Sequence, residues 1–268
     1  MPIAVITGSG TYALPGFEPR EALTVPTPFG DADVSRGGFA GTELLHVSRH
    51  GTGHRRLSNH INHRANIWAL HKLGAQAVIG CTACGAVDPS LALGSLVVFG
   101  DLHFPVNRLP DGSLCTFCVE PGDRRRGHWI LHGGPFSAEL RSALLAAAAE
   151  AGHDAHAGGA YGHVDGPRFN TPAEIAQLAA CGVVAVSQTG GPETVLCGEL
   201  ELPFALIGFV TDYANEVVAG DPTPVARLIE LMGASPAVFA DVLAGAVTRV
   251  ERGPVKPAGT MYRFEQGC

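Results

Sequence analysis

The chain has 268 residues, of which 46% are hydrophobic and 16% are charged, and its formal net charge is −7. A chain of this length and composition can bury a substantial core, and it is too apolar to be disordered. The negative charge argues against nucleic acid as a partner, because proteins that bind polyanions present a basic face. A small anion could still bind where a few cations converge in one cleft.

The sequence also bears on membranes and redox compartment. No apolar run reaches the roughly 18 residues that a membrane-spanning helix needs, and the strand-like start of the chain lacks a basic leader. The seven cysteines are an odd number for a disulfide framework. We therefore expect a cytoplasmic protein with reduced thiols and no membrane partner.

Short apolar segments alternate with helical patterns along the chain, which is typical of an α/β sheet. Strands are predicted over Ile3–Thr7, Leu44–Ser48, Ala77–Cys81, Leu96–Gly100, Val183–Ser187 and Phe204–Val210. No internal repeat or linker is visible. We expect one domain over residues 1–268, an α/β fold with a mixed twisted β-sheet flanked by helices.

Three helices have sequence signals. Periodic apolar residues predict a helix over Asn62–Leu73. Thr171, followed by Pro and by Glu three residues on, predicts a capping box and a helix that runs to about Cys181. Ser235, again followed by Pro, predicts a last helix over about residues 235–250. The stretch Phe104–Pro135 lacks periodicity and is read as a long excursion at a site edge or subunit contact.

Two short motifs that follow strands could bind an anion. The Gly-rich turn Thr7–Gly10 can direct backbone amides and the Ser9 hydroxyl to an anion, although alone it is equally a plain turn. Arg49 is followed by His50 and Gly51, and an arginine fork can bind phosphate in bidentate fashion. A solvated loop is the alternative for this second motif.

Histidines and cysteines leave a metal alternative open. The residues concerned are His50, His54, His60 and His63, and the pairs Cys81/Cys84 and Cys115/Cys118. The spacing between the two cysteine pairs exceeds that of a zinc ribbon, and no Asp or Glu lies between His50 and Leu73 to complete a histidine site. We therefore expect no metal.

Two residues suit a flat heterocycle. Phe169, just before the predicted capping box, could stack on a base, although a loop Phe is more often core. Asp212 follows the apolar strand that ends at Val210. A partly buried carboxyl at that point could stay protonated and donate to a ring nitrogen, whereas a capping or turn role is the alternative.

Taken together, the motifs resemble the trimeric purine nucleoside phosphorylase superfamily, and most of all its S-methyl-5′-thioadenosine phosphorylase branch. The resemblance runs over about residues 3–225. The motifs that carry it, in the order usual for the family, are Gly8–Gly10, Arg49–Gly51, Ala65–Leu70, Thr82–Gly85, Gly166–Phe169, Pro192-Glu193 and Thr211–Tyr213.

This resemblance implies a phosphorylase-type fold, a homotrimer, and phosphorolysis of a purine nucleoside to free purine and a ribose 1-phosphate. No metal or organic cofactor is implied, and inorganic phosphate is the co-substrate. The implied phosphate pocket consists of Ser9, Arg49, His50, Thr82, Ala83 and Thr189. The implied substrate residues are Phe169, Asn170, Gln188, Asp212, Ala214 and Val225, with Asp212 as the acid that faces purine N7 and Val225 beside the 5′ substituent.

Departures from the family pattern affect the choice of substrate. Gln188 replaces the usual Met and would put a polar amide near the sugar, and Ala214 replaces a second Asp. Asn170 could serve either a 6-amino or a 6-oxo base, because its amide both donates and accepts. Trp129 lies roughly where a neighbouring subunit would cap the 5′ pocket. The expected substrate is S-methyl-5′-thioadenosine or another 5′-modified adenosine.

Three alternatives stay open at this point. The first is a phosphorylase of 6-oxopurine nucleosides such as inosine, guanosine or methylthioinosine. The second is a zinc-dependent hydrolase or deaminase built on the histidines or cysteines. The third is a nucleoside-binding protein without catalysis, which Gln188 and Ala214 suggest.

Overall fold

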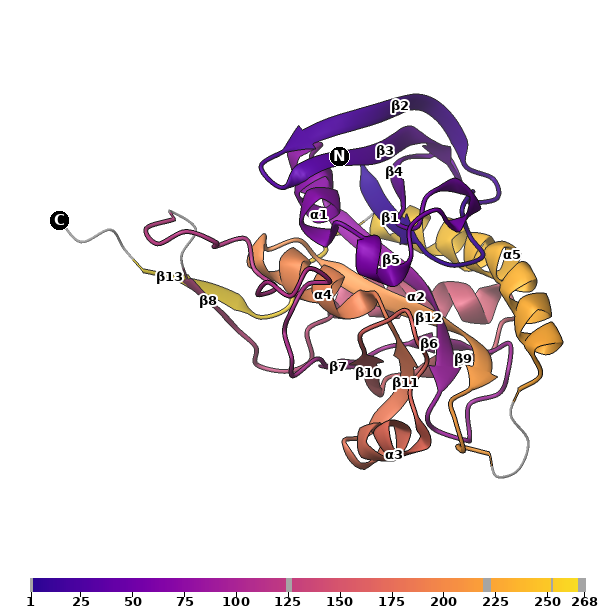
Figure 1. Ribbon diagram of the computed structural model, residues 1–268. Coiled ribbons are helices and arrows are strands. Elements are labelled where there is room, and N and C mark those ends of the chain that lie inside the picture. Colours follow the sequence, from indigo (N-terminus) through magenta and orange to yellow (C-terminus); the bar gives the residue numbers. More distant parts are fainter. Residues whose placement is uncertain (1, 124–126, 219–222, 252, 265–268) are drawn as a thin grey trace.

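The computed structural model describes residues 2–123, 127–218, 223–251 and 253–264 (Figure 1). These residues form an 11-stranded sheet. Its strands are β1 (Ile3–Thr7), β2 (Glu18–Thr27), β3 (Gly30–Phe39), β4 (Thr42–Ser48), β5 (Ala77–Ala86), β6 (Leu96–Val98), β7 (Asp101–His103), β9 (Ala155–Ala157), β10 (Ala160–His163), β11 (Val183–Ser187) and β12 (Phe204–Tyr213). The helices are α1 (His63–Lys72), α2 (Ala138–Glu150), α3 (Pro172–Ala180), α4 (Gly190–Glu199) and α5 (Val225–Val250). A mixed sheet flanked by helices confirms the predicted α/β fold class.

Four strands at the centre of the sheet run in the same direction. β1 pairs in parallel with both β4 and β5, and β12 pairs in parallel with β5. β11 runs antiparallel to the end of β5, where Val186 lies opposite Gly85. The carboxyl ends of β1, β4, β5 and β12 therefore meet at one edge, which is where open α/β sheets bind ligands.

Helices cover the two faces of the sheet in separate layers (Figure 1). One buried cluster joins Leu70 of α1 and Leu196 of α4 to Val78 of β5. A second joins Leu144 of α2 and Leu243 of α5 to Ile207 of β12. α3 packs separately, with Ile175 and Leu178 against the strand β11.

Strands predicted from apolar runs are present, but several extend further than expected. β1 and β11 have the predicted bounds, whereas β5 continues through Ala86 and β12 through Tyr213. Asp212 therefore lies within β12, after a register shift that follows Val210, and not beyond the strand. A bulge of this kind re-aims a side chain without ending the pairing.

The antiparallel strands β2 and β3 were not predicted. Every residue of β2 except Val25 is partly or fully exposed, so the segment lacks the alternation by which a half-buried strand is recognised. β2 and β3 pair in antiparallel fashion on either side of a tight turn, at which Thr27 lies opposite Gly30.

The last helix begins ten residues earlier than the predicted start at 235. α5 runs over Val225–Val250 with Pro236 inside it. Proline cannot donate to the carbonyl four residues before it, which here belongs to Met232. The Ser235 hydroxyl donates to that carbonyl at 2.9 Å. A Ser-Pro pair that reads as a helix start is thus accommodated in the middle of a helix.

By length and composition alone, α5 could cross a membrane. No apolar run of that length was expected from the sequence. The buried residues of α5, among them Phe239, Leu243 and Val247, share a cluster with α2 and the sheet. The helix is therefore explained as part of the hydrophobic core.

A two-stranded arm extends from the body of the molecule (Figure 1). It pairs β8 (Gly127–Ile130) with β13 (Thr260–Arg263) in antiparallel fashion.

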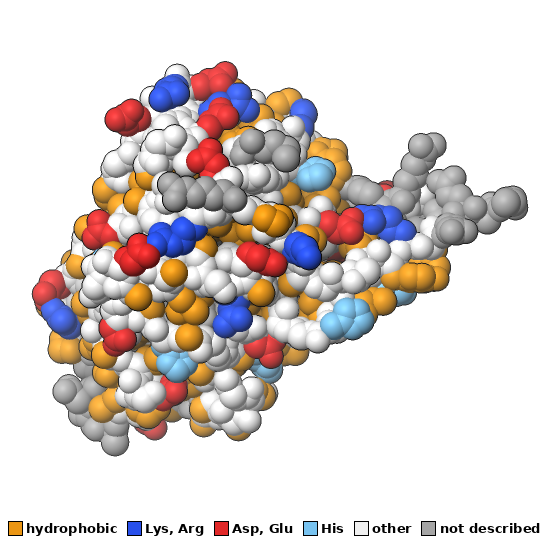
Figure 2. All heavy atoms as spheres, turned by 180° about the vertical axis from the view of Figure 1, so that it is seen from behind, with side chains coloured by type: hydrophobic (Ala, Val, Ile, Leu, Met, Phe, Trp, Pro, Cys, Tyr) orange, Lys and Arg blue, Asp and Glu red, His pale blue; other side chains and the backbone are white. Residues whose placement is uncertain are grey.

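On the face shown in Figure 2, Lys and Arg side chains lie interspersed with Asp and Glu side chains. This mixture on that face gives no extended basic surface of the kind that nucleic acids require.

Leu243→Ala should lower the free energy of unfolding by about 2–5 kcal/mol, because it removes a fully buried side chain and leaves a cavity. Urea denaturation measures the loss. Ile229→Ala, on the same helix but 63% exposed, is the control and should change stability by less than about 0.5 kcal/mol. Equal losses would show that α5 does not pack as described.

Candidate active site

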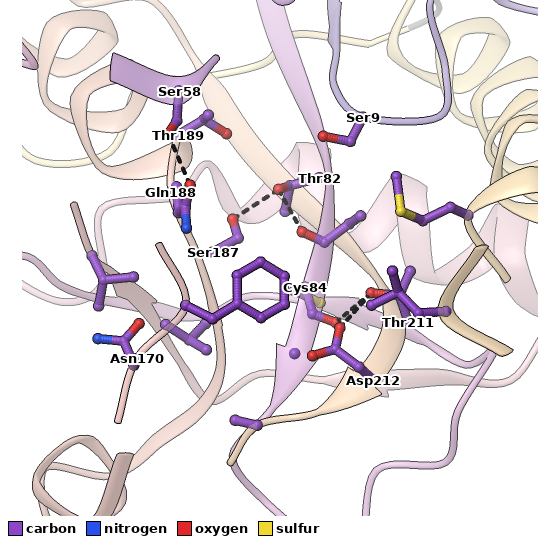
Figure 3. Close-up of a pocket in the computed structure, with 18 of the residues that line it drawn as sticks. Ser9, Ser58, Thr82, Cys84, Asn170, Ser187, Gln188, Thr189, Thr211 and Asp212 are labelled. Carbon is purple, nitrogen blue, oxygen red and sulfur yellow. Dashed lines mark hydrogen bonds between the residues drawn. The ribbon is translucent and has the colours of Figure 1, made fainter. Parts of the chain in front are cut away.

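A cavity of about 530 Å³ opens at the carboxyl ends of the central strands. All of the site residues implied by the sequence line it, namely Ser9, Arg49, His50, Thr82, Ala83, Phe169, Asn170, Gln188, Thr189, Asp212, Ala214 and Val225. Residues far apart in the chain are thus brought together, because β1, β4, β5, β11 and β12 all end here (Figure 3).

Arg49, the residue after β4, is almost fully buried and paired with Glu193 of α4. Its Nε and Nη2 atoms donate to the two Glu193 carboxylate oxygens at 2.7 and 2.9 Å, and the two side chains are 1% and 2% exposed. Nη1 donates to the Cys81 carbonyl at 2.7 Å. The fork that was expected to bind phosphate is thus paired with Glu193 in this structure, while Arg49 lines the cavity, and phosphate binding by Arg49 stays a prediction.

The Gly-rich turn is shaped by the same guanidinium. A Cβ atom at Gly8 would lie 2.6 Å from Arg49 Nη1. At Gly10, where φ is +81°, a Cβ would lie 2.6 Å from the Met232 carbonyl of α5. The two glycines thus allow the turn to approach Arg49 on one side and α5 on the other, and this close packing directs Ser9 toward the cavity.

His50 enters the cavity as a neutral side chain. Burial, helped by the Arg49 charge, lowers the pKa of His50 to about 4. Its Nδ1 lies 2.8 Å from the Arg56 carbonyl, which only accepts, so Nδ1 carries the proton. Nε2 is then left as an acceptor. The ring stacks on His54 with centroids 4.3 Å apart.

A chain of hydroxyl groups fixes one wall of the cavity. Tyr161 Oη accepts from the backbone N–H groups of Thr189 and Gly190 at 3.4 and 3.0 Å. Its own proton therefore goes to Ser187 Oγ at 2.7 Å, and Ser187 in turn lies 2.8 Å from Thr82 Oγ1. This network ties the start of α4 to the end of β11 and the middle of β5. Figure 3 shows the link between Ser187 and Thr82.

Asp212 faces the cavity with a carboxyl group whose pKa is raised by burial. The Thr211 hydroxyl donates to its Oδ1 at 2.7 Å. In the protonated acid, the proton is therefore on Oδ2. A Cβ at position 85 would lie 3.0 Å from that oxygen, so Gly85 leaves it room.

The sequence suggested that Gln188 puts a polar amide near the sugar, but in the structure both polar atoms of this amide are already hydrogen-bonded. Its Oε1 accepts from Ser58 Oγ at 2.8 Å, and its Nε2 donates to the Arg168 carbonyl at 2.9 Å. The side chain thus joins two loops across the cavity. Phe169, on the second of these loops, lines the cavity and is 66% exposed.

One end of the cavity is apolar. Val225, Leu228 and Met232 all line it from one side of α5. Ala214, where the family pattern has a second acid, is buried at 8% exposure and offers no polar side chain. Asn170 donates to Glu174 Oε2 at 3.2 Å.

Trp129 is not in this cavity. It lines a second cavity, near the arm, and its Nε1 donates to the Ala258 carbonyl at 2.9 Å. The cysteines of the zinc alternative are mostly buried thiols, and burial raises the pKa of Cys81 to about 12. Within the described ranges, no three His, Cys, Asp or Glu side chains are grouped as metal ligands.

Several residues of the site were not predicted, among them Glu193, Tyr161, Ser187 and Ser58. Glu193 carried a signal, because its neighbours from Gly190 to Gly198 are all small or apolar. A charge in such a stretch indicates a buried partner. The hydroxyl residues gave no comparable signal.

Glu193→Gln should destabilise the protein by about 3–5 kcal/mol, because it leaves the Arg49 charge buried without its counter-charge. Urea denaturation measures this loss. Glu230→Gln, which breaks the exposed Arg227–Glu230 pair, is the control and should cost far less. If both variants lose the same small amount, the buried pair does not hold the site together.

Comparison with known proteins places the chain in a family. The model of the phosphorylase superfamily matches residues 2–249. The 6-oxopurine nucleoside phosphorylase of Pyrococcus furiosus is 35% identical over 234 residues, which are 86% of each chain. The S-methyl-5′-thioadenosine phosphorylase of Geobacter sulfurreducens is 31% identical over 264 residues, 98% of this chain and 90% of that one.

A solved structure shares the fold. Methylthioadenosine phosphorylase from Schistosoma mansoni, in complex with adenine, superposes with a TM-score of 0.84 at 26% identity, covering 95% of this chain and 93% of that one. These matches confirm the resemblance drawn from the motifs. The chain therefore belongs to the phosphorylase superfamily, among the purine nucleoside phosphorylases, which are pentosyltransferases.

Proposed function

We propose that this purine nucleoside phosphorylase cleaves S-methyl-5′-thioadenosine, or another 5′-modified adenosine, with inorganic phosphate. The products are adenine and a 5-modified ribose 1-phosphate. The observation that carries the proposal is the buried Asp212 carboxyl, with a raised pKa, in a cavity that is also lined by hydroxyl groups able to donate to an anion.

The phosphate end is built mainly from neutral groups. Ser9, Thr82 and Thr189 line it with hydroxyl groups, and the Arg49 charge is balanced by Glu193. Neutral His50 offers Nε2 as an acceptor, which suits the one remaining proton of HPO₄²⁻. Oriented in this way, a phosphate oxygen attacks C1′ of the sugar while the C1′–N9 bond breaks.

The leaving purine receives the electron pair of that bond. Oδ2 of Asp212 donates its proton, or a hydrogen bond, to purine N7, which stabilises the negative charge that develops on the base. Burial supports this role because it raises the pKa of the carboxyl and so favours its protonated form. Solvent restores the proton after the purine leaves.

The preference for a 5′-modified sugar is supported by the apolar end of the cavity. Val225 is 71% exposed and lines the cavity with Leu228 and Met232. A methylthio group would cover these side chains, whereas a 5′-hydroxyl would lose its hydrogen bonds to water there.

The preference for a 6-amino base is supported by Asp212 as well. Oδ1 accepts from Thr211 and retains a second lone pair, which can accept from an exocyclic amino group while Oδ2 donates to N7. The structural relative from Schistosoma mansoni is described in complex with adenine.

A 6-oxopurine nucleoside is the second candidate, and Ala214 favours it. The apolar side chain there offers no acceptor for a 6-amino hydrogen. The relative from Pyrococcus furiosus is named for 6-oxopurine nucleosides, and the one from Pseudomonas syringae, 34% identical, is named probable S-methyl-5′-thioinosine phosphorylase. A homotrimer and a cytoplasmic location are further proposals that rest on the family alone.

A nucleoside panel with and without phosphate tests the function. Methylthioadenosine, adenosine, methylthioinosine, inosine and guanosine are incubated with the protein, and free purine is measured. We expect phosphate-dependent release of adenine, fastest from methylthioadenosine. Release of only hypoxanthine or guanine would move the 6-oxopurine candidate to first place, and release without phosphate would contradict the mechanism.

Asp212→Asn should lower kcat by about 10²–10⁴-fold, because the amide donates a hydrogen bond but transfers no proton. In the wild type, kcat/KM should be constant at low pH and fall as the pH rises through the raised pKa of Asp212, since the protonated form is active. The variant should lose this fall. Wild-type turnover in the variant would remove Asp212 from the mechanism.

A further inference from the structure

Phe169 is a cavity-lining ring with little packing to hold it. The ring is 66% exposed and stands on a loop between β10 and α3. A side chain so exposed is fixed mainly by its own backbone, so what holds the loop also determines where the ring lies.

The two carbonyl groups on either side of Phe169 each accept a hydrogen bond from a side-chain amide. Gln188 Nε2 donates to the Arg168 carbonyl at 2.9 Å. Asn215 Nδ2 donates to the Asn170 carbonyl. The two donors come from different walls of the cavity, one between β11 and α4 and the other just after β12.

Gln188 is itself held in place. Ser58 Oγ donates to its Oε1 at 2.8 Å, so both ends of the amide are engaged (Figure 3). The loop approaches this pair closely, since a Cβ at Gly166 would lie 1.9 Å from Gln188 Oε1 and 2.2 Å from Ser58 Oγ. Only glycine permits this contact, and the three groups therefore form one junction.

We infer that Gln188 and Asn215 are positioning residues for the purine: together they fix the backbone on both sides of Phe169 and so hold its ring as a platform for the base. The inference rests on the proposed function, in that Phe169 stacks on the purine. A thioether at position 188 could not donate to the Arg168 carbonyl, so the platform in this chain depends on an amide. Substrate discrimination at the base thus extends to two residues that need not touch it.

Gln188→Met tests the inference, because it keeps the length of the side chain and removes the amide. KM for the nucleoside and Kd for the free purine should rise about 3- to 10-fold, the range of one aromatic stacking contact. KM for phosphate should not change. Asn215→Ala should act in the same direction. Gln177→Met, on the exposed side of α3, is the matched control and should change neither constant.

A double-mutant cycle separates positioning from a direct contact. If Gln188 acts through the ring, Gln188→Met should have little further effect in a Phe169→Ala background. Additive effects of Gln188→Met and Phe169→Ala would overturn the inference, as would a change in phosphate KM of the same size.

Calorimetry with adenine and with hypoxanthine distinguishes failure of the inference from failure of the proposed function, since it needs no turnover. A wild type that binds purine but releases none from nucleosides would contradict the proposed reaction. The Kd for free purine in the Gln188→Met and Asn215→Ala variants would still test whether these residues position Phe169. A wild type that binds neither purine would overturn both. Wild-type Kd values in Gln188→Met and Asn215→Ala would overturn the inference alone.

Discussion

The arrangement of this site depends on one buried ion pair. Arg49 contacts Glu193 across 144 positions of sequence, and it also donates to carbonyl groups of Cys81 and, at 3.4 Å, Ile6. One side chain at the end of β4 is thereby joined to β1, β5 and α4. Burying two charges costs desolvation energy that their attraction only partly returns. The pair is therefore better understood as fixing geometry than as adding stability, and Gly8 is the residue that gives it room.

The same pair determines the electrostatics of the cavity. Because Glu193 balances Arg49, and because burial lowers the pKa of His50 to about 4, the proposed phosphate end has few net charges and many directed donors and acceptors. A preorganised set of dipoles can stabilise a dianion without excess positive charge, which fits a protein with a net charge of −7. At the other end, burial raises the pKa of the Asp212 carboxyl and so favours its protonated form. The two ends thus differ in chemistry although neither requires a cofactor to do so.

Local patterns in the sequence predicted much of this arrangement. β1 and β11 have the predicted bounds, and α3 has Thr171 as its N-cap in the predicted capping box, because apolar runs and caps depend on neighbouring residues. Contacts over long separations could not be predicted in the same way. The pairing of the Arg49 fork with Glu193 is such a contact, because Glu193 lies on a helix far along the chain. Likewise, Ser235 and Pro236 have the sequence of a helix start. The structure shows instead that they lie inside a helix, where the Ser235 hydroxyl donates to the Met232 carbonyl.

The departures from the family pattern at Gln188 and Ala214 had suggested a protein without catalysis. In the structure, both the oxygen and the nitrogen of the Gln188 side-chain amide are hydrogen-bonded, so the residue is accommodated by a junction that includes Ser58. Compared with the family pattern, Ala214 lacks the carboxylate of the second Asp. The carboxyl of Asp212, the ring of His50 and the donors beside them still line the cavity. The two departures therefore bear on the proposed purine contacts, whereas the groups proposed to act on the glycosidic bond are separate from them.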